Sequence, residues 1–277
     1  MAKRNWLITG VSSGIGLALA KAVLARGDRV AGTVRSDQDA QAFRALSADD
    51  ARPVRVDLAE PATVPAAVAG LVQEIGPIDV LVNNAGYSLY GALEELSPAA
   101  IAHQINTNLH GPIALMQALL PSMRERRDGR IINISSIAGV IGFPGQPAYC
   151  ASKFALNGLS EALAGEVAQF GIRVTLVEPG GFRTEWTGRS MKRPENMLSC
   201  YDDVTGRSRQ NFEKLHGHQQ GDPERAAKVI IDLADHPEPP VHLLLGKDAL
   251  KYVRGYLAGR LKSIDALESI SASTDYA

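Results

Sequence analysis

The sequence predicts an α/β fold: a doubly wound parallel sheet of about seven strands with helices on both faces. Short apolar runs rich in Val, Ile and Leu alternate with longer segments whose apolar residues recur at helical spacing. The apolar runs are nearly continuous, which is typical of strands covered on both faces. No internal repeat or linker interrupts the chain, so we expect residues 1–277 to form one domain.

The bulk composition indicates a globular protein with a substantial core. Of the 277 residues, 45% are hydrophobic and 21% charged, and the formal net charge is -1. We therefore expect neither nucleic acid nor a membrane as a partner, and no transmembrane helix. Residues 1–6 lack a signal-peptide core, and Cys150 and Cys200 lack metal-type spacing, so the cytoplasm is the expected compartment.

Seven strands are expected, at residues 6–9, 29–34, 52–56, 78–82, 130–134, 172–177 and 241–245. Helices are expected at 15–26, 38–46, 61–76, 98–123, 149–170, from 223 onward, and at 247–262. Gly111 and Pro112 should break the fourth of these helices, while Asp222 and Pro223 have the residue types of an N-cap and a first helical position. Strands that alternate with helices in this way form right-handed βαβ units.

Two segments depart from this alternation. Residues 185–221 are polar and lack strong periodicity, and we interpret them as a mobile lid over the functional site. Residues 263–277 are small and polar, which predicts a flexible tail.

A glycine run after the first strand predicts a Rossmann-type dinucleotide site. Thr9 ends the strand, and Gly10, Gly14 and Gly16 follow before the helix, with Ser12, Ser13 and Ile15 between them. The glycines let the backbone approach a pyrophosphate, and the helix N-terminus offers free N–H groups and a favourable dipole. The alternative interpretation is a tight strand-to-helix turn made of small residues.

The end of the second strand bears on the choice of cofactor. Arg35 is well placed to pair with the 2′-phosphate of NADP(H), and Ser12 is expected to add a hydroxyl contact. NADP(H) is therefore the preferred cofactor. Asp37 keeps NAD(H) open, because a carboxylate that reached the ribose would bind its 2′-hydroxyl.

Tyr149 and Lys153 are one helical turn apart, and Ser136 precedes the tyrosine by thirteen residues. Residues at i and i+4 share one face of a helix. A neighbouring ammonium favours the phenolate, so the pKa of Tyr149 is expected to fall from its usual value of about 10. Such a phenol can exchange a proton with an alcohol or carbonyl oxygen.

Taken together, these motifs resemble the short-chain dehydrogenase/reductase family. Besides the TGxxxGIG and YxxxK motifs, the matching segments are Asp57-Leu58, Asn83-Asn84-Ala85-Gly86, Asn108-Leu109-His110-Gly111, Ile132–Ser136 and Pro179–Thr184, all in the family's order. They cover residues 5 to about 185. The resemblance implies a single-domain oxidoreductase that transfers hydride between nicotinamide and a carbonyl or secondary alcohol.

The resemblance also implies roles in cofactor binding. Asp57 contacts the adenine amino group with Leu58 beside it, and Asn84, Ala85 and Gly86 pack the central strand against the cofactor. Pro179, Gly180 and Thr184 border the nicotinamide.

For catalysis, the resemblance implies that Ser136 orients the substrate oxygen and Tyr149 is the acid/base. Lys153 holds the nicotinamide ribose and lowers the pKa of the tyrosine. Asn108 holds a helix kink and connects Lys153 to solvent through water. The family spacing to the tyrosine selects Ser136 rather than Ser135.

We therefore expect an NADPH-dependent ketone or aldehyde reductase. The alternative is a catalytically silent sensor or scaffold that binds NADP(H). A third hypothesis is an epimerase or dehydratase of this fold. The substrate should have an apolar face, because the expected pocket walls include Tyr87, Tyr90, Ile141, Phe143, Phe182, Trp186 and Met191.

Three further expectations concern metals, thiols and assembly. His216 and His218 lack an obvious third ligand, so no metal site is expected. The Cys150 thiol should face away from Tyr149 and serve packing, since neighbours on a helix point about 100° apart. A homodimer or homotetramer is expected through helices 98–123 and 149–170, which carry more apolar surface than one sheet face needs.

Overall fold

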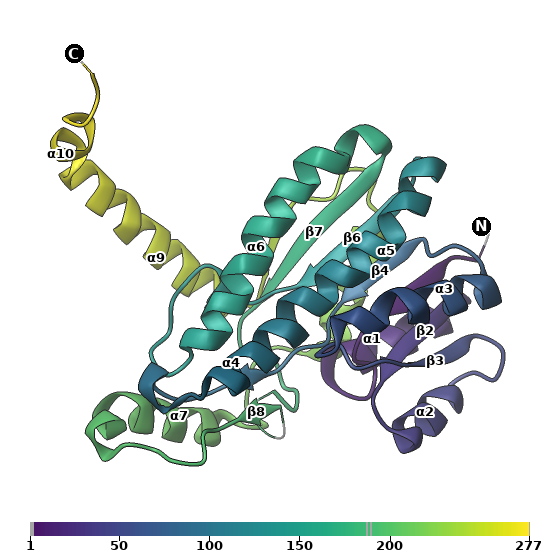
Figure 1. Cartoon of the computed structure of the whole chain (residues 1–277), viewed down its shortest axis with the longest axis horizontal. Coiled ribbons are helices and arrows are strands. Elements are labelled where there is room, and N and C mark those ends of the chain that lie inside the picture. The colour runs from purple at the N-terminus through teal and green to yellow at the C-terminus, as the bar shows by residue number, and fades with distance from the viewer. Residues whose placement is uncertain (1–2, 187, 189, 277) are drawn as a thin grey trace.

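The computed structural model describes residues 3–186, 188 and 190–276. The termini of the expected domain, together with Thr187 and Arg189 of the expected lid, lie outside those residues. A parallel sheet forms the centre of the molecule (Figure 1). It has seven strands in the order β3-β2-β1-β4-β6-β7-β9. Its strands are β1 (Asn5–Ile8), β2 (Arg29–Val34), β3 (Ala51–Arg55), β4 (Val80–Asn83), β6 (Gly129–Ile134), β7 (Ile172–Pro179) and β9 (His242–Leu245).

The sheet confirms the fold class, and each expected strand agrees with an observed one to within two residues at either end. The helices are α1 (Gly14–Ala25), α2 (Asp37–Arg44), α3 (Val64–Ile75), α4 (Pro98–Ile105), α5 (Gly111–Arg126), α6 (Pro147–Val167), α7 (Arg207–Leu215), α8 (Pro223–Asp235), α9 (Lys247–Ala266) and α10 (Glu268–Ala272). Shorter turns of helix are Pro61–Thr63, Leu93–Glu95, Asn106–His110, Ile137–Gly139, Ala168–Phe170, Ser199–Tyr201 and Asp202–Gly206.

Two hydrophobic cores lie on opposite faces of the sheet. Trp6 and Ile8 of β1 point to the face covered by α1, α2 and α8, whereas Leu7 between them points to the face covered by α3, α5 and α6. Successive side chains of a strand alternate between faces, so an apolar run of this kind fills both cores. This explains why the strands are apolar throughout rather than at every second residue.

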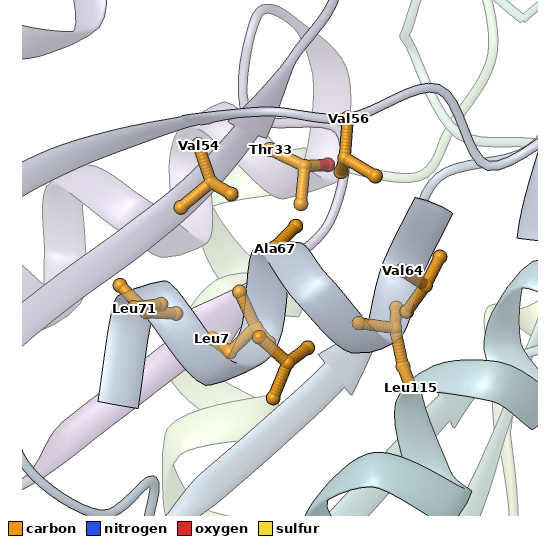
Figure 2. Close-up of a pocket in the computed structure, with 9 residues that line it drawn as sticks. Leu7, Thr33, Val54, Val56, Val64, Ala67, Leu71 and Leu115 are labelled. Carbon is orange, nitrogen blue, oxygen red and sulfur yellow. The ribbon is translucent and has the colours of Figure 1, made fainter. Parts of the chain in front are cut away.

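A small apolar cavity remains beneath α3, on the face that Leu7 occupies. Figure 2 shows its lining, which comes from β1, β2, α3, α5 and the segment around β3: Leu7, Thr33, Val54, Val56, Val64, Ala67, Val68, Leu71 and Leu115. It has room for about one water molecule, and Thr33 is the one polar side chain of this lining. The hydroxyl of Thr33 accepts a hydrogen bond from the Gly10 N–H at 2.9 Å. The cavity is therefore a packing defect and not a ligand site.

The helix expected at 98–123 is broken as predicted, one turn earlier than its glycine and proline suggest. α4 and α5 are joined by a π-helical turn, Asn106–His110, in which the Gly111 N–H bonds the Asn106 carbonyl. Pro112 has no N–H to donate to the carbonyl of Asn108, so the regular helical ladder is interrupted here. The turn buries Asn108, which is 1% exposed.

The C-terminal third contains more regular structure than the sequence predicts. The expected lid segment includes α7 and β8 (Met191–Lys192), which pairs in parallel with β5 (Ser88–Leu89). The last helix continues beyond 262 to Ala266, and α10 follows, so much of the expected tail at 263–277 is helical. α9 projects away from the body of the protein (Figure 1). Within the described residues, no helix is long and apolar enough to span a bilayer.

Candidate functional site

The candidate site lies at the carboxyl edge of the sheet, where the strand order reverses between β1 and β4. The glycine turn follows β1, and Asn84 to Gly86 follow β4. Ser136 follows β6, and Pro179 is the last residue of β7. Parallel strands expose their carboxyl ends at one edge, so segments far apart in the sequence meet here, at the position where ligands bind in open α/β sheets.

Close backbone packing explains the glycines of the turn. A Cβ on Gly16 would lie 2.3 Å from the Gly10 carbonyl oxygen and 2.4 Å from Asn84 Nδ2, and neither contact can be accommodated without movement. Gly10 has a φ of 71°, a conformation that favours glycine. The Asn84 side-chain amide donates to the carbonyls of Thr9 and Gly10, at 2.8 and 3.2 Å. The turn and the end of β4 therefore hold each other in place.

The start of α1 can receive an anion. Residues 14–17 are Gly, Ile, Gly and Leu, which bring no negative charge to the first turn. Within the described residues, the Ser13 side chain makes no capping hydrogen bond, so it leaves the first helical N–H groups available. A Cβ on Gly14 would lie 3.3 Å from the Thr184 side chain. The segment after β7 thus reaches the glycine turn, as the expected cofactor site requires.

Three charged side chains, those of Arg35, Asp37 and Asp57, follow the carboxyl ends of β2 and β3. Arg35 is exposed directly after β2. Asp37 begins α2 and forms an ion pair with Arg55, so its carboxylate already has a cationic partner. Asp57 is exposed, and its Oδ1 accepts the Ala59 N–H at 3.0 Å, which fixes the side chain in a local turn. Leu58 is buried and packs against Gly111. A Cβ added to Gly111 would lie 2.7 Å from the Cβ of Leu58.

Ser136 and Tyr149 meet at the centre of the edge. The Ser136 hydroxyl hydrogen-bonds the Tyr149 side chain, and Tyr149 is 5% exposed. Ser135 points elsewhere, because its Oγ donates to Asn157 Oδ1 at 2.5 Å. The structure thus brings Ser136, and not its neighbour, to the tyrosine.

Lys153 completes the cluster one turn along α6. Its Nζ donates to the carbonyl of Ile134 at 2.8 Å and lies 5.9 Å from the centroid of the Tyr149 ring. A Cβ on Gly86 would lie 3.2 Å from Asn108 Oδ1 and 3.7 Å from Lys153 Nζ, so both side chains converge on this glycine. Asn108 is held by Tyr87, whose N–H it accepts at 3.2 Å, and by Ser152, to whose Oγ it donates at 3.1 Å.

Burial dominates the ionisation of the cluster. It raises the pKa of Tyr149 to about 12, although the hydrogen bonds from Ser136 and Trp186 lower it. It lowers the pKa of Lys153 to about 8. The spacing argument, which expects a lowered tyrosine pKa, is therefore wrong for the protein chain alone. Desolvation disfavours the charged form of both groups, and it is the largest cause of each shift.

Aromatic side chains form the wall above the tyrosine. The ring centroids of Tyr149 and Trp186 are 5.6 Å apart, and those of Trp186 and Phe212 are 5.8 Å apart. Phe212 in turn lies 5.8 Å from Tyr90. Trp186 and Tyr90 are among the expected pocket walls, whereas Phe212 was missed because α7 was not predicted.

Two other side chains near the site, Phe182 and Cys150, contribute to packing. Phe182 was expected to line the pocket, but it packs against the core under α1 and α8, so that assignment is wrong. Cys150 does serve packing as expected: it is 7% exposed, and its Sγ accepts the Phe143 N–H at 3.3 Å.

A polar network that includes the buried side chains of Asn157 and Glu178 lies behind the site and is absent from the sequence expectations. Asn157 Nδ2 donates to the Gly139 carbonyl at 3.2 Å and to Glu178 Oε1 at 2.7 Å. His242 Nδ1 lies 3.4 Å from the same carboxylate oxygen. Burial raises the pKa of Glu178, and His242 lowers it. The network joins the segment after Ser136 to the end of β7, so it supports both sides of the site.

Across the residues that the structure describes, no three His, Cys, Asp or Glu side chains come together as a metal site would require.

Comparison with known proteins agrees with this geometry. The family model for short chain dehydrogenase matches residues 4–195. Oxidoreductase BOA17 of Botryotinia fuckeliana is 37% identical over 98% of this chain and 95% of its own length. The 3-ketodihydrosphingosine reductase of Bacteroides thetaiotaomicron is 39% identical over 87% of each chain.

Solved structures resemble this chain over most of its length. A short-chain dehydrogenase from Streptomyces avermitilis superposes with a TM-score of 0.92 at 38% identity, covering 99% of this chain and 100% of that one. A metagenomic short-chain oxidoreductase in complex with NADP gives a TM-score of 0.69 at 30% identity, covering 87% of this chain and 96% of that one.

Proposed function

Because the chain belongs to the short-chain dehydrogenase/reductase family, we propose that it is an NADP(H)-dependent carbonyl reductase that interconverts a ketone or aldehyde and its alcohol. The observation that carries the proposal is the hydrogen-bonded pair of half-buried Ser136 and buried Tyr149, with Lys153 one turn away, beside the glycine turn. Two hydroxyl groups that share one hydrogen bond at a sheet edge can both reach one substrate oxygen.

The residues at the edge fit a dinucleotide. Gly16 and Gly10 keep the turn free of side chains, and the first N–H groups of α1 can receive the pyrophosphate. Gly86, Lys153 and Thr184 would border the nicotinamide half, and Asp57 and Leu58 the adenine half. When bound, the nicotinamide supplies or accepts the hydride.

The chain's own groups handle the proton. In the direction of reduction, negative charge develops on the substrate oxygen, and Ser136 and Tyr149 donate hydrogen bonds to it. Tyr149, with its raised pKa, is protonated at neutral pH, so the Oη–H can be given to that oxygen. Lys153 is close enough to the ring to stabilise the phenolate that is left. Asn108 positions this end of α6 through Ser152.

Two observations support NADP(H) over NAD(H). Arg35 is exposed immediately after β2, where a guanidinium can pair with a 2′-phosphate. Asp37, the residue that keeps NAD(H) open, is ion-paired with Arg55.

The aromatic wall supports a substrate with a sizeable apolar face. Trp186 and Phe212 belong to the segment 185–221, which we propose to be a lid that moves when substrate enters, because Trp186 lies directly against the catalytic tyrosine. The name of the Bacteroides relative makes 3-ketodihydrosphingosine the first ketone to test. The free cysteines Cys150 and Cys200 fit the cytoplasmic location that the sequence predicts.

The test is NADPH oxidation over ketones and aldehydes of increasing chain length, 3-ketodihydrosphingosine included, with Tyr149→Phe measured in parallel. We expect turnover by the wild type alone and unchanged NADPH binding by the variant, since only the hydroxyl is removed. Equal turnover by both proteins would contradict the acid/base role of Tyr149.

The second candidate, a catalytically silent sensor that binds NADP(H), predicts NADPH binding without turnover on any member of the panel. The intact trio of Ser136, Tyr149 and Lys153 favours the enzyme.

A further inference from the structure

The C-terminal part of α9 packs against no other part of the described chain except its continuation into α10. At its start, Ala249 and Val253 are buried against the body of the protein. Asp248 Oδ2 accepts the Gly181 N–H at 2.7 Å, which anchors the helix beside the loop that follows β7. Beyond Val253 the helix leaves the body (Figure 1), and every described residue from 257 to 276 is exposed.

An apolar stripe continues along this uncovered part. Leu257, Leu261 and Ile264 follow Val253 at intervals of four, eight and eleven residues, so they extend the face that Val253 buries. Their side chains, and those of Leu267 and Ile270, are between 49% and 66% exposed. A helix without tertiary contacts has only marginal stability in water. A run of five large, exposed apolar side chains therefore indicates a surface that another molecule covers.

The charges on α9 and α10 are divided along the chain. Residues 247–262 contain five cationic side chains, of which Lys251, Arg254 and Arg260 accompany the apolar stripe, whereas residues 263–276 contain Asp265, Glu268 and Asp275 and no cation. Among the residues that the structure describes, none of these six named side chains forms an ion pair within its own chain. The segment therefore has a basic first half and an acidic end.

We infer that α9 and α10 form an interface with a second copy of this chain, in which the two helices pair antiparallel about a twofold axis. In this arrangement the stripe of each copy covers that of the other, and the acidic end of each lies beside the basic half of its partner. A parallel pair would place like charges together. The surface differs from helices 98–123 and 149–170, where Phe154 is the one large hydrophobic side chain among the described residues that is exposed.

A bilayer is the other surface that a basic amphipathic helix can fit. The stripe continues over Leu267 and Ile270, and there the accompanying charges are Asp265 and Glu268. Carboxylates at that end would meet the negative surface of an anionic membrane unfavourably. The charge pattern thus favours a second copy, and this inference does not depend on the proposed catalytic activity.

The first test is the mass of the full chain in solution, by sedimentation velocity across a range of concentrations. Leu261→Asp together with Ile264→Asp should halve the mass of the assembly relative to the wild type. Tyr252→Asp is the matched control: it changes an equally exposed residue of the same helix, and it lies nine residues from Leu261, on the opposite face. We expect the control to keep the wild-type mass. An unchanged mass for the double variant, or halving by the control as well, would overturn the inference.

NADPH binding and the far-ultraviolet circular dichroism of each variant show whether it is folded. Because the substituted residues are exposed and remote from the glycine turn, we expect both to match the wild type.

A charge exchange tests whether charge complementarity holds the two copies together. One variant carries Asp265→Lys and Glu268→Lys, and the other carries Lys251→Glu and Arg254→Glu. Each alone should dissociate at low salt, and an equimolar mixture should recover the wild-type mass. A mixture that stays dissociated would exclude antiparallel pairing. Sedimentation of the wild type with vesicles of phosphatidylcholine and phosphatidylserine, combined with a monomeric mass, would assign the surface to a membrane and refute the inference.

Discussion

The two ends of the candidate site are built by opposite means. At the glycine turn, the packing requires the absence of a side chain: a Cβ on Gly16 would lie 2.3 Å from a backbone oxygen. The proposed catalytic cluster is instead a group of polar side chains crowded together, with Tyr149 and Lys153 each 5% exposed. The glycine turn thus has no room for side-chain atoms, whereas the cluster around Tyr149 and Lys153 is shielded from water.

This difference determines how each end should respond to change. A steric requirement is strict, since an added atom forces the backbone to move, and its effect does not vary with pH. A desolvated cluster is polar, so its effects depend on protonation and include a cost in stability. The following predictions test this contrast.

Gly16→Ala should weaken NADPH binding by at least about 100-fold, because the new Cβ meets the Gly10 carbonyl and the Asn84 amide. Gly158→Ala in α6 is the matched control, since a Cβ there points into open space. That control should stabilise the protein by about 0.5–1 kcal/mol through helix propensity. Binding is measured by fluorescence titration, and a Gly16→Ala protein with normal affinity would remove the steric argument.

Ser136→Ala should lower kcat by about 10²–10³, the usual effect of removing one donor to a developing oxyanion. Ser135→Ala should leave kcat within a few-fold but destabilise the fold by about 1–2 kcal/mol, because Asn157 loses the donor at 2.5 Å. Steady-state kinetics and urea denaturation of both variants separate the two roles. A loss of kcat in Ser135→Ala as large as that in Ser136→Ala would show that the two serines act together.

Lys153→Met should abolish activity and yet stabilise the protein at pH 7. The pKa of Lys153 falls from 10.5 to about 8 on folding, so a buried charge costs about 3 kcal/mol at low pH. The variant also loses the hydrogen bond to the Ile134 carbonyl, which lowers its free energy of unfolding by about 1 kcal/mol. The net stabilisation is therefore about 2 kcal/mol.

The sign of this gain depends on pH. Below pH 8 both the folded and unfolded chains bind the proton, and the penalty removed by Lys153→Met is complete. Between pH 8 and 10.5 the folded chain is neutral at Lys153 while the unfolded chain holds the proton, so the wild type gains stability relative to the variant. Urea denaturation at several pH values measures this, and a gain independent of pH would mean that packing, not desolvation, is responsible.

Arg35→Ala should weaken NADPH binding by about 10-fold, the value of a surface-accessible charge pair with phosphate, and leave NADH binding unchanged. Arg44→Ala, at the other end of α2 and also exposed, should alter neither. Equal weakening of both cofactors by Arg35→Ala would remove the 2′-phosphate assignment.

The same contrast explains which features the sequence predicts. The glycine turn and the strands depend on local patterns, so the fold class, the turn after Thr9 and the ends of β2 follow from residue types and spacing. The Asp222 N-cap is confirmed for the same reason, since its side chain accepts the Glu224 N–H at 2.8 Å.

Features that depend on burial were not predictable in this way. The spacing of Tyr149 and Lys153 gives their common face but not the desolvation that reverses the expected pKa shift of the tyrosine. The Asn157, Glu178 and His242 network joins α6, β7 and β9, which no local pattern connects. The helical tail is different: Ile264, Leu267 and Ile270 recur every three residues, and the many small residues obscured that signal.

The contact between α1 and α8 has a consequence for synthesis on the ribosome. α1 is made near the beginning of the chain, but residues of α8, such as Ile230 and Leu233, belong to the same core. Until residue 235 has left the exit tunnel, the apolar face of the nascent α1 has no cover from this helix. The glycine turn that α1 supports is therefore completed late in translation, so cofactor capture should follow release of nearly the whole polypeptide rather than accompany its early growth.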